Sequence, residues 1–371
     1  MRILLFANTD WFLFNFKRAL ARALRAAGHE LVLLSPPGEF AQRLRDEGFD
    51  WRPFAVSRSG INPLAELLTI WRLWRLYREI RPDVVHHFTI KCVIYGSFAA
   101  RLAGVARVVN SITGLGFAML ADTPKARLIR PVVLALYRFA LRGSQVLFQN
   151  QDNLKTLADF GVLRHAHACV VPGDGIDTER FAPPADHVPG RVVLMMGRLL
   201  ASKGIAEYVA AARIVRGALP DARFLLAGAP DPGNPECIAA AQLAEWQAEG
   251  AVEFLGQRSD VLTLTQSADV VVLASTQGEG MPRALLEGAA CGKPMVGTDV
   301  AGSRELVVNG ENGFLVPPGD AAALAAAIQR VLEDPHLARL LGQSARKTVV
   351  TLYSDACVVA HSFRAYGLRD D

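Results

Sequence analysis

The chain has 371 residues, 51% of them hydrophobic and 20% charged, which is normal for a soluble globular protein and long enough for two domains. No apolar run has the ~20 residues of a membrane-spanning helix, RILLFA resembles a buried strand rather than a signal peptide, and five scattered cysteines argue against a disulfide framework or a zinc site. Residues 1–182 carry 24 Lys and Arg against 15 Asp and Glu, a net +9, whereas residues 183–371 carry 16 against 21, a net −5. This predicts that the first half faces an anionic partner, a membrane surface or nucleic acid; the alternative is plain compositional drift.

Strands and helices are expected to alternate from the start of the chain. The segment NTDWFLFNF at 8–16 is interpreted as the loop after the first strand. The expected strands of the first half are 2–7, 29–36, 51–56, 82–88, 107–113, 145–150 and 169–173, and the expected helices are 16–28, 41–48, 63–80, 93–104, 130–143 and 153–161.

The second half repeats the alternation after a proline-rich stretch, FAPPADHVPG at 181–190, which is expected to be a linker. The predicted domains are 1–182 and 183–371, with the last helix packing back on the first domain. This pattern predicts an α/β protein with two doubly wound Rossmann-like domains facing across a cleft, and ligands at the carboxyl ends of the strands. The expected strands are 191–197, 223–228, 252–256, 270–275, 294–298 and 314–317, and the expected helices are 205–217, 238–249, 282–292 and 321–333.

Two cations follow the first strand of the second domain, in VLMMGRLLASKG. Gly197 is expected to form the turn, and Gly204 to allow close backbone approach before the next helix. Arg198 and Lys203, at a strand-to-helix turn, could neutralise a diphosphate without a metal. The alternative is that both are ordinary exposed surface cations.

Two glutamates lie eight positions apart in GEGMPRALLEGAACGKP. If a helix begins near Pro282, Glu279 lies in the loop before it and Glu287 lies on its second turn. The helix amino terminus suits a phosphate, and carboxylates accept hydrogen bonds from hydroxyl groups. The pair therefore predicts a pocket for a nucleotide-activated sugar, although Glu287 could instead be a solvated helix residue.

These motifs together resemble glycosyltransferase family 4. The resemblance rests on GRLLASKG, the paired glutamates, GKPMVGTDVAGSRELVVNGENGFLVPPGD, and VVPGDGIDTERF at 170–181. It implies a GT-B fold, a nucleotide-sugar donor, retention of anomeric configuration, and no metal or other cofactor. The implied site roles are the donor diphosphate for Arg198 and Lys203, the sugar hydroxyls for Glu279, the ribose hydroxyls for Glu287, and donor contacts for Gly197, Gly280 and Met281.

The first domain departs from the family pattern in two places. Many relatives have a glycine-rich loop after the first strand, whereas this chain has none there, and many have a histidine at the position of Thr113. His86 and His87, at the end of a strand, are possible substitutes for that histidine or are structural. The candidate acceptor or sugar contacts of this domain are Asn8, Thr9, Asp10, His86, His87, Thr113 and Gly114.

A narrower resemblance concerns the acceptor. FLFNF, SRSGINPL, HFTIKCVIYGS, NSITGLGF and DPGNPECIAAAQLAEWQ resemble bacterial transferases of surface-polysaccharide and N-glycan assembly. These act on sugars carried by undecaprenyl diphosphate, and the resemblance implies transfer of N-acetylgalactosamine from its UDP form to diacetylbacillosamine on that lipid. By position alone, Lys91 would meet the acceptor's diphosphate.

Two helical segments combine aromatic and aliphatic residues with arginines, which is typical of helices lying on anionic lipid. In residues 64–78 the expected apolar face is Leu64, Leu67, Leu68, Trp71, Trp74 and Tyr77, beside Arg72, Arg75 and Arg78; residues 125–142 have a similar mix. We therefore expect a cytoplasmic protein held on the inner face of the plasma membrane. Either segment could instead be a core helix with basic solvent edges.

Three other classes of function fit parts of the pattern. A UDP-N-acetylhexosamine 2-epimerase would share the two domains and the UDP site, but it would need no lipid-facing surface. An NAD-dependent oxidoreductase is disfavoured because no G-x-G-x-x-G follows the first strand. A nucleic-acid-binding protein is disfavoured because the basic residues alternate with leucine and tryptophan on helices.

Overall fold

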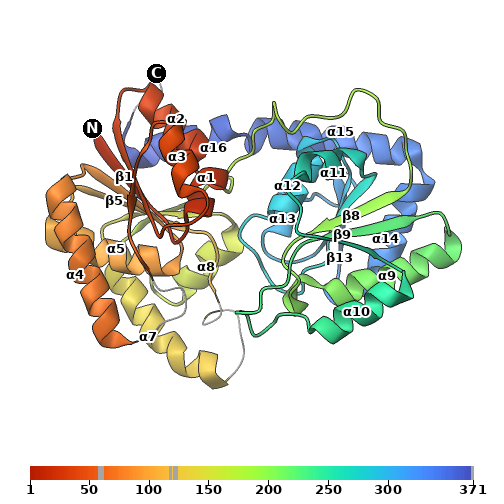
Figure 1. Cartoon of the computed structure of the whole chain (residues 1–371), viewed down its shortest axis with the longest axis horizontal. Helices are drawn as coiled ribbons and strands as arrows, with labels where there is room; N and C mark the ends of the chain where they lie inside the picture. The colour runs from red at the N-terminus through yellow and green to blue at the C-terminus, as the bar shows by residue number, and fades with distance from the viewer. Residues whose placement is uncertain (57–61, 117–118, 120–123, 369–371) are drawn as a thin grey trace. The chain divides into compact units, whose positions relative to one another are not determined.

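The computed structural model describes residues 1–56, 62–116, 119 and 124–368, which form two compact units (Figure 1). Unit 1 comprises Met1–Gly175 with Asp355–Asp371, and unit 2 comprises Ile176–Ser354. The expected boundary at 182 thus falls inside unit 2, and the last helix belongs to unit 1. Most of SRSGINPL, at 57–61, and the last residue of NSITGLGF, at 117, lie outside the described residues.

The described residues of unit 1 form a seven-stranded parallel sheet in the order β3-β2-β1-β4-β5-β6-β7. Central strands such as β1 and β4 are short apolar runs buried on both faces, as expected in a parallel sheet covered by helices, whereas the edge strands β3 and β7 are partly exposed. From β1 to β3 the strands are added toward one edge of the sheet, and from β4 to β7 they are added toward the other, so β1 and β4 are neighbours. The strands are β1 (Arg2–Phe6), β2 (Glu30–Ser35), β3 (Asp50–Pro53), β4 (Val84–Phe88), β5 (Arg107–Ile112), β6 (Gln145–Phe148) and β7 (His167–Val170).

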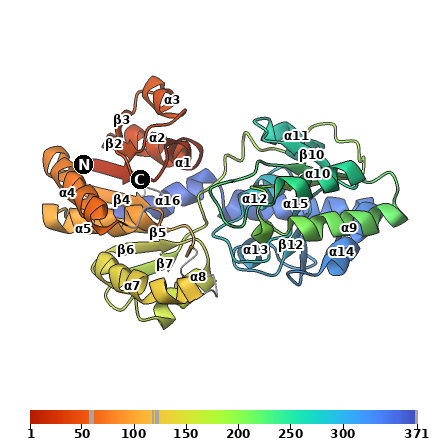
Figure 2. The same cartoon turned by 60° about the horizontal axis from the view of Figure 1, so that its bottom comes forward.

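Helices cover both faces of the unit 1 sheet. One face packs on α1, α2, α3 and α16, and the other on α4, α5, α7 and α8. Helices α4, α5 and α7 lie side by side in that order (Figures 1 and 2). The helices are α1 (Asp10–Phe16), α2 (Arg18–Ala26), α3 (Ala41–Asp46), α4 (Pro63–Ile80), α5 (Ile90–Ala103), α7 (Pro124–Leu141), α8 (Gln151–Asp159) and α16 (Asp355–Tyr366).

The segment after β1 is a helix, not the expected loop. Thr9 caps the amino terminus of α1 by accepting a hydrogen bond from the backbone N–H of Phe12 at 3.1 Å. The Phe12 ring lies 5.6 Å from the Phe88 ring and 5.2 Å from the Phe16 ring. The interpretation of 8–16 as a loop was therefore wrong, because packing against β4 orders this aromatic segment.

The described residues of unit 2 form a second parallel sheet of six strands, in the order β10-β9-β8-β11-β12-β13. This is the doubly wound order, with the reversal of direction between β8 and β11. The strands are β8 (Val192–Met196), β9 (Arg223–Ala227), β10 (Glu253–Gly256), β11 (Val270–Leu273), β12 (Met295–Thr298) and β13 (Gly313–Val316).

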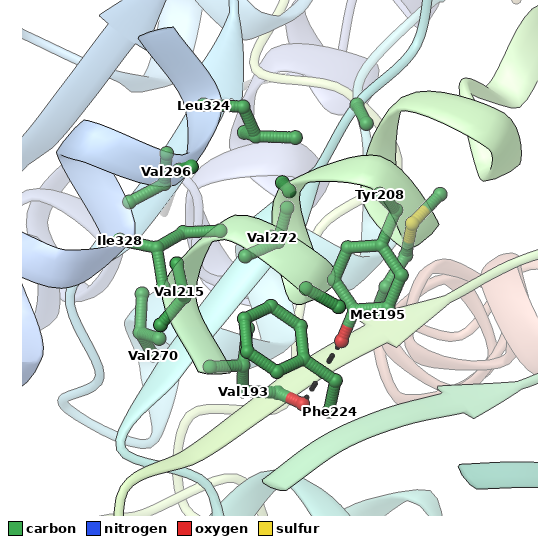
Figure 3. Packing of buried hydrophobic residues seen from close by; sticks show 14 of the residues in the cluster. Val193, Met195, Tyr208, Val215, Phe224, Val270, Val272, Val296, Leu324 and Ile328 are labelled. Carbon is green, nitrogen blue, oxygen red and sulfur yellow. Dashed lines mark hydrogen bonds between the residues drawn. The ribbon is translucent and has the colours of Figure 1, made fainter. Parts of the chain in front are cut away.

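Two hydrophobic layers enclose this sheet. Residues of β8 alternate between them, because successive side chains of a strand point to opposite faces. On one face, the Tyr208 hydroxyl donates to the Val193 carbonyl at 3.0 Å, and the Tyr208 ring lies 5.4 Å from the Phe224 ring (Figure 3). The helices are η1 (Ala201–Lys203), α9 (Ile205–Ala218), α10 (Ala240–Glu249), α11 (Val261–Ser267), α12 (Arg283–Ala290), α13 (Ser303–Leu306), α14 (Ala321–Glu333) and α15 (Pro335–Leu352).

Over the described residues, no helix combines the length and the hydropathy needed to cross a bilayer.

Candidate functional site

The reversal point of the unit 2 sheet brings two loops together. Strands β8 and β11 pair in parallel, so the loops that follow them leave the same edge of the sheet. In doubly wound sheets, ligands bind outside the carboxyl ends of the strands at this point. One loop, residues 197–204, leads to α9, and the other, residues 274–282, leads to α12.

A glycine allows these two loops to touch. Gly204 has a φ of 70°, and a side chain on it would overlap with the backbone carbonyl of Ala274. Beside this contact, the backbone N–H of Thr276 donates to the Ser202 carbonyl at 2.9 Å. The positive φ and the close approach both require glycine, so this motif glycine fixes the spacing of the site.

The centre of the site is an ion pair between the loops. The Lys203 ammonium lies 2.7 Å from Oε2 of Glu279, and each side chain is 20% exposed. The hydroxyl of Ser275 donates to the other carboxylate oxygen, and the backbone N–H of Glu279 donates to the Ala301 carbonyl at 3.0 Å. Glu279 is therefore held in one orientation by three neighbours, which lie in the segments after β8, β11 and β12.

Glu287 lies on α12 and faces a different cation. The helix begins at Arg283, directly after Pro282, as the sequence predicted. Arg283 Nε donates to Glu287 Oε1 at 2.9 Å, one turn apart on the helix. Burial raises the pKa of the Glu287 carboxyl, and the charge and hydrogen bond of Arg283 oppose that rise. The reading of Glu287 as a freely solvated residue is thus contradicted, since its side chain is only 13% exposed.

The two motif cations differ in environment. Arg198 is 59% exposed and pairs with Asp231 at 2.8 Å, whereas Lys203 is enclosed with Glu279. A second acidic residue of the same segment, Glu236, accepts a hydrogen bond from Ser202. The segment after β9 therefore packs on the loop after β8, and a diphosphate at this loop would compete with Asp231 for the Arg198 guanidinium.

The remaining predicted donor contacts lie around this centre. Gly197 directly follows β8, and its N–H donates to the Ala227 carbonyl at 3.0 Å. Gly280 lies against Gly302, where a side chain would collide with the Gly280 carbonyl. Met281 is half-buried and packs against the core beside α12.

Sequence reasoning missed four neighbours of these residues. The i, i+4 spacing of Arg283 and Glu287 could have revealed one of them. Ser275 lies four positions before Glu279 in the same loop, whereas Asp231 and Glu236 come from the segment after β9, so no local pattern indicates those two. The four are Asp231, Glu236, Ser275 and Arg283.

In unit 1, both candidate histidines are core residues. His86 is 1% exposed, and its ring nitrogens lie 2.6 Å from the Tyr366 hydroxyl and 2.7 Å from the Ser111 hydroxyl. His87 is fully buried, and its ring nitrogens lie 3.0 Å from the Tyr77 hydroxyl and 2.9 Å from Asn110 Oδ1. With both nitrogens of each ring bonded to protein, the structural alternative is favoured for both histidines, and a sugar contact by either stays a prediction.

Burial explains the protonation of these two rings. It lowers the pKa of His87 to about 4, and it lowers the pKa of His86 well below its usual range, with the Lys17 ammonium adding to the effect. Both imidazoles are therefore neutral at pH 7, which suits structural hydrogen bonds in a core.

The loop after β1 is also engaged within the protein. Thr9 caps α1, and Asp10 accepts hydrogen bonds from the backbone N–H groups of Trp11 and Phe40, both at 2.8 Å. Asp10 is 5% exposed, so its carboxylate ties this loop to the segment after β2. Its substrate contact stays a prediction. Asn8, by contrast, is half-buried at the carboxyl end of β1.

Three further candidates lie near the carboxyl ends of β4 and β5. Thr113 and Gly114 are half-buried and directly follow β5. Lys91, in the first turn of α5, lies 2.7 Å from Glu66 of α4. An acceptor diphosphate would therefore compete with Glu66 for Lys91, and the acceptor role of these three residues stays a prediction.

A resident metal would need a cluster of ligands. Within the part of the chain that the structure describes, no group of three or more His, Cys, Asp or Glu side chains could hold a metal ion. The charged groups of the Lys203–Glu279 site are the Lys203 ammonium and the Glu279 carboxylate. An ammonium and an oriented carboxylate at a sheet edge can bind a phosphate group and a neighbouring hydroxyl.

Both units match known family descriptions. Residues 2–151, in unit 1, match "Glycosyl transferase 4-like", and residues 190–334, in unit 2, match "Glycosyl transferases group 1". The second match contains the loops that carry Lys203, Glu279 and Glu287. Together the two matches cover most of both units.

Two curated relatives are similar over long stretches of the chain. An N,N'-diacetylbacillosaminyl-diphospho-undecaprenol alpha-1,3-N-acetylgalactosaminyltransferase of Campylobacter jejuni is 29% identical, over 98% of this chain and 97% of the relative. A UDP-Gal:alpha-D-GlcNAc-diphosphoundecaprenol alpha-1,3-galactosyltransferase of Escherichia coli is 27% identical, over 78% of this chain and 76% of the relative. The names of both relatives include undecaprenyl-diphosphate-linked sugars.

Solved structures agree on the fold. Anabaena HepE, determined with UDP and glucose, superposes with a TM-score of 0.79 at 21% identity, over 99% of both chains. A sucrose-phosphate synthase from Thermosynechococcus elongatus gives a TM-score of 0.79 at 22% identity, over 99% of this chain and 98% of the other. The predicted GT-B fold, with two doubly wound Rossmann-like units, is thereby confirmed.

Proposed function

Because this chain belongs to the group 1 glycosyltransferases with a 4-like amino-terminal domain, we propose that it transfers N-acetylgalactosamine from UDP to an acetamido sugar on undecaprenyl diphosphate. The observation that carries the proposal is the Lys203–Glu279 pair at the reversal point of the unit that matches the group 1 description. The similarity to the Campylobacter jejuni transferase over almost the whole chain supports the choice of donor and acceptor.

The proposed reaction retains the anomeric configuration and uses no metal. The bond from C1 of the sugar to the phosphate oxygen breaks, the acceptor hydroxyl oxygen bonds to C1 on the same face, and its proton passes to the departing phosphate. Lys203 and Arg198 offset the charge that develops on the diphosphate. Glu279 accepts hydrogen bonds from the sugar hydroxyls, and Glu287 from the ribose hydroxyls, so the protein acts by orientation and charge stabilisation.

A transfer assay tests this proposal. Purified protein is incubated with UDP-N-acetylgalactosamine and undecaprenyl-diphosphate-linked diacetylbacillosamine, with and without EDTA, and the product anomer is determined by NMR. We expect an alpha-linked disaccharide at the same rate in both arms. UDP-galactose is tested as the alternative donor, and undecaprenyl-diphosphate-linked N-acetylglucosamine as the alternative acceptor.

The same assay distinguishes sugar transfer from the alternative activity, epimerisation of the UDP-sugar. The relatives compared above give no support to a UDP-N-acetylhexosamine 2-epimerase. An epimerase would convert the UDP-sugar without any acceptor, whereas a transferase requires one. Conversion of UDP-N-acetylglucosamine by the protein alone, with no transfer to either lipid acceptor, would contradict the proposed function.

An apolar and basic surface on unit 1 supports action at a membrane. On α4, the exposed side chains Leu64, Leu67 and Trp71 lie at i, i+3 and i+7, with exposed fractions of 77%, 62% and 47%. The Arg75 guanidinium lies 5.0 Å from the centre of the Trp71 ring. Apolar side chains beside arginines suit the interface of an anionic bilayer, so we propose that this face of α4 binds the inner surface of the plasma membrane.

The surface differs from the one expected from spacing. Tyr77 is 1% exposed and bonded to His87, and Trp74 packs partly into the core, so neither belongs to the exposed face. Helix α7 adds a second exposed row, Leu128, Val132, Leu136 and Phe139, which follows one side of that helix. Both helices pack on α5 in unit 1 (Figure 2).

Introducing negative charge on α4 tests membrane binding. We expect the double variant Leu67→Glu, Trp71→Glu to lose roughly tenfold or more in affinity for vesicles containing anionic lipid, because it loses apolar contact and gains repulsion. The measurement is co-sedimentation with vesicles. The control is Ile214→Glu, Leu340→Glu, which alters two exposed apolar residues of unit 2. Equal sedimentation of both variants and the wild type would reject α4 as the membrane contact.

A further inference from the structure

Unit 2 contains a pocket at the edge of the sheet opposite the Lys203–Glu279 site. The pocket has a volume of about 470 Å³, and its polar lining includes Arg191, Asp269 and Lys293, which lie just before β8, β11 and β12. It is thus at the amino ends of the strands, away from the loops described above. A pocket of this size can hold a small molecule. Its apolar walls come largely from Pro183, Pro184, Pro189, Pro294 and Pro335, with Leu332 and Ala338.

A buried ammonium lines this pocket. Lys293 is 4% exposed, and its Nζ lies 3.2 Å from Nδ1 of His187. His187 Nε2 in turn lies 2.7 Å from Asp269, whose second oxygen accepts the backbone N–H groups of Gly190 and Val192 at 3.0 and 2.7 Å. With the imidazole proton on Nε2, facing Asp269, Nδ1 is free to accept from the ammonium.

The Lys293 ammonium has more donors than partners. An ammonium carries three N–H donors, and among the described residues His187 is its one hydrogen-bond acceptor. Burial lowers the pKa of Lys293 to about 8, against the opposing charge of Asp269. Burying a cation with unused donors is costly unless an anion or another acceptor joins it.

A second cation lining the pocket shows how a purely structural cation is satisfied here. Arg346 donates to the backbone carbonyls of Phe181 and Ala290, both at 2.6 Å, and to that of Thr178 at 2.8 Å. Arg346 therefore ties the linker region to α12 through three of its five N–H donors. Among the described residues Lys293 makes no such bond to a backbone carbonyl, and its one partner is His187.

We propose that this pocket binds a carboxylate that carries an apolar chain, with the Lys293 ammonium holding the carboxylate and the proline walls covering the chain. The exposed Arg339, on α15 at the same pocket, adds a positive charge near the entrance. The site is separate from the proposed donor site, and it does not depend on the sugar specificity of the enzyme.

Calorimetry with decanoate tests the proposal on the whole chain. We expect decanoate to bind, and decanol and acetate to bind at least roughly tenfold more weakly, because each lacks one half of the recognised chemistry. Lys293→Met should reduce decanoate affinity by a similar factor. The control Lys347→Met removes an exposed lysine of α15 that does not line the pocket, and it should leave decanoate affinity unchanged.

A second variant keeps the test decisive if Lys293→Met fails to fold. Ala338→Phe fills the pocket while leaving Lys293, His187 and Asp269 in place, so it should lose decanoate binding and retain UDP binding. Absence of decanoate binding to the wild type, equal affinity for decanoate and decanol, or unchanged decanoate affinity in Ala338→Phe would each overturn the proposal. Because UDP binding is measured separately, failure here leaves the proposed function unaffected.

Discussion

Replacing Glu279 with glutamine is expected to abolish sugar transfer and to leave the fold intact. The amide keeps the size of the carboxylate and can still accept from Ser275, but it cannot form the 2.7 Å ion pair with Lys203. We expect the rate of transfer to fall by about a hundredfold or more, which is ~3 kcal/mol of transition-state stabilisation. The measurement is kcat/KM with the UDP-sugar, alongside the far-UV circular dichroism spectrum.

A control variant tests whether the loss of transfer is specific to Glu279. Glu333→Gln removes a carboxylate from an exposed position of α14 in the same unit, and it should behave as the wild type. If Glu279→Gln transferred sugar at the wild-type rate, Glu279 would have no role in the reaction. If its spectrum or thermal midpoint changed strongly, the loss of activity would instead reflect a structural role.

Replacing Lys203 with methionine is the second change with a large expected effect. The ammonium is enclosed between two loops, where it can offset diphosphate charge with little screening by water. We expect the affinity for UDP and the rate of transfer both to fall, the rate by about a hundredfold. Calorimetry with UDP and steady-state kinetics measure the two effects separately.

Arg198→Met supplies the comparison for Lys203. Arg198 is 59% exposed and already paired with Asp231, so its removal should cost less than the removal of Lys203. The double variant of Lys203→Met with Glu279→Gln should lose less than the sum of the two single losses, because the residues contact one another. Additive losses, or a larger effect at Arg198, would contradict the central place of the Lys203–Glu279 pair.

The local pattern of the sequence predicted most of the strands and helices. Apolar runs bounded by Gly, Pro and Asp mark the parallel strands, and the 3.6-residue period marks helices such as α4 and α9. The start of α12 after Pro282 was predicted from the apolar residues behind this proline, which is the extended N-cap of the helix. The helix α1 was missed, because NTDWFLFNF becomes helical only when Phe12 packs against Phe88.

In the candidate site, too, the sequence predicted some features and the structure alone showed others. The motif spacing identified Lys203, Glu279 and Glu287 as site candidates, and Gly204 as a point of close approach. Lys203 and Arg198 take their partners from other loops, so spacing could not indicate that Lys203 pairs with Glu279 while Arg198 pairs with Asp231.

The histidines and α4 show what local sequence cannot decide. A His-His pair at the end of β4 has the same local pattern in a core and in a substrate site. Its role is decided by Tyr366, which lies 280 positions from His86 in the chain. On α4, the helical period predicted an amphipathic helix, but only packing on α5 and the sheet placed Tyr77 inside and Trp71 outside.

The sequence by itself determined the two-unit α/β architecture, the family, and which loops carry the charges of the candidate site. These follow from patterns within a few turns of chain, where side-chain spacing and backbone preference act directly. The tertiary structure alone decided which charges pair, which polar groups are buried, and which apolar faces stay exposed. Those outcomes depend on the order of strands in the sheet, which brings residues together that are far apart in the chain.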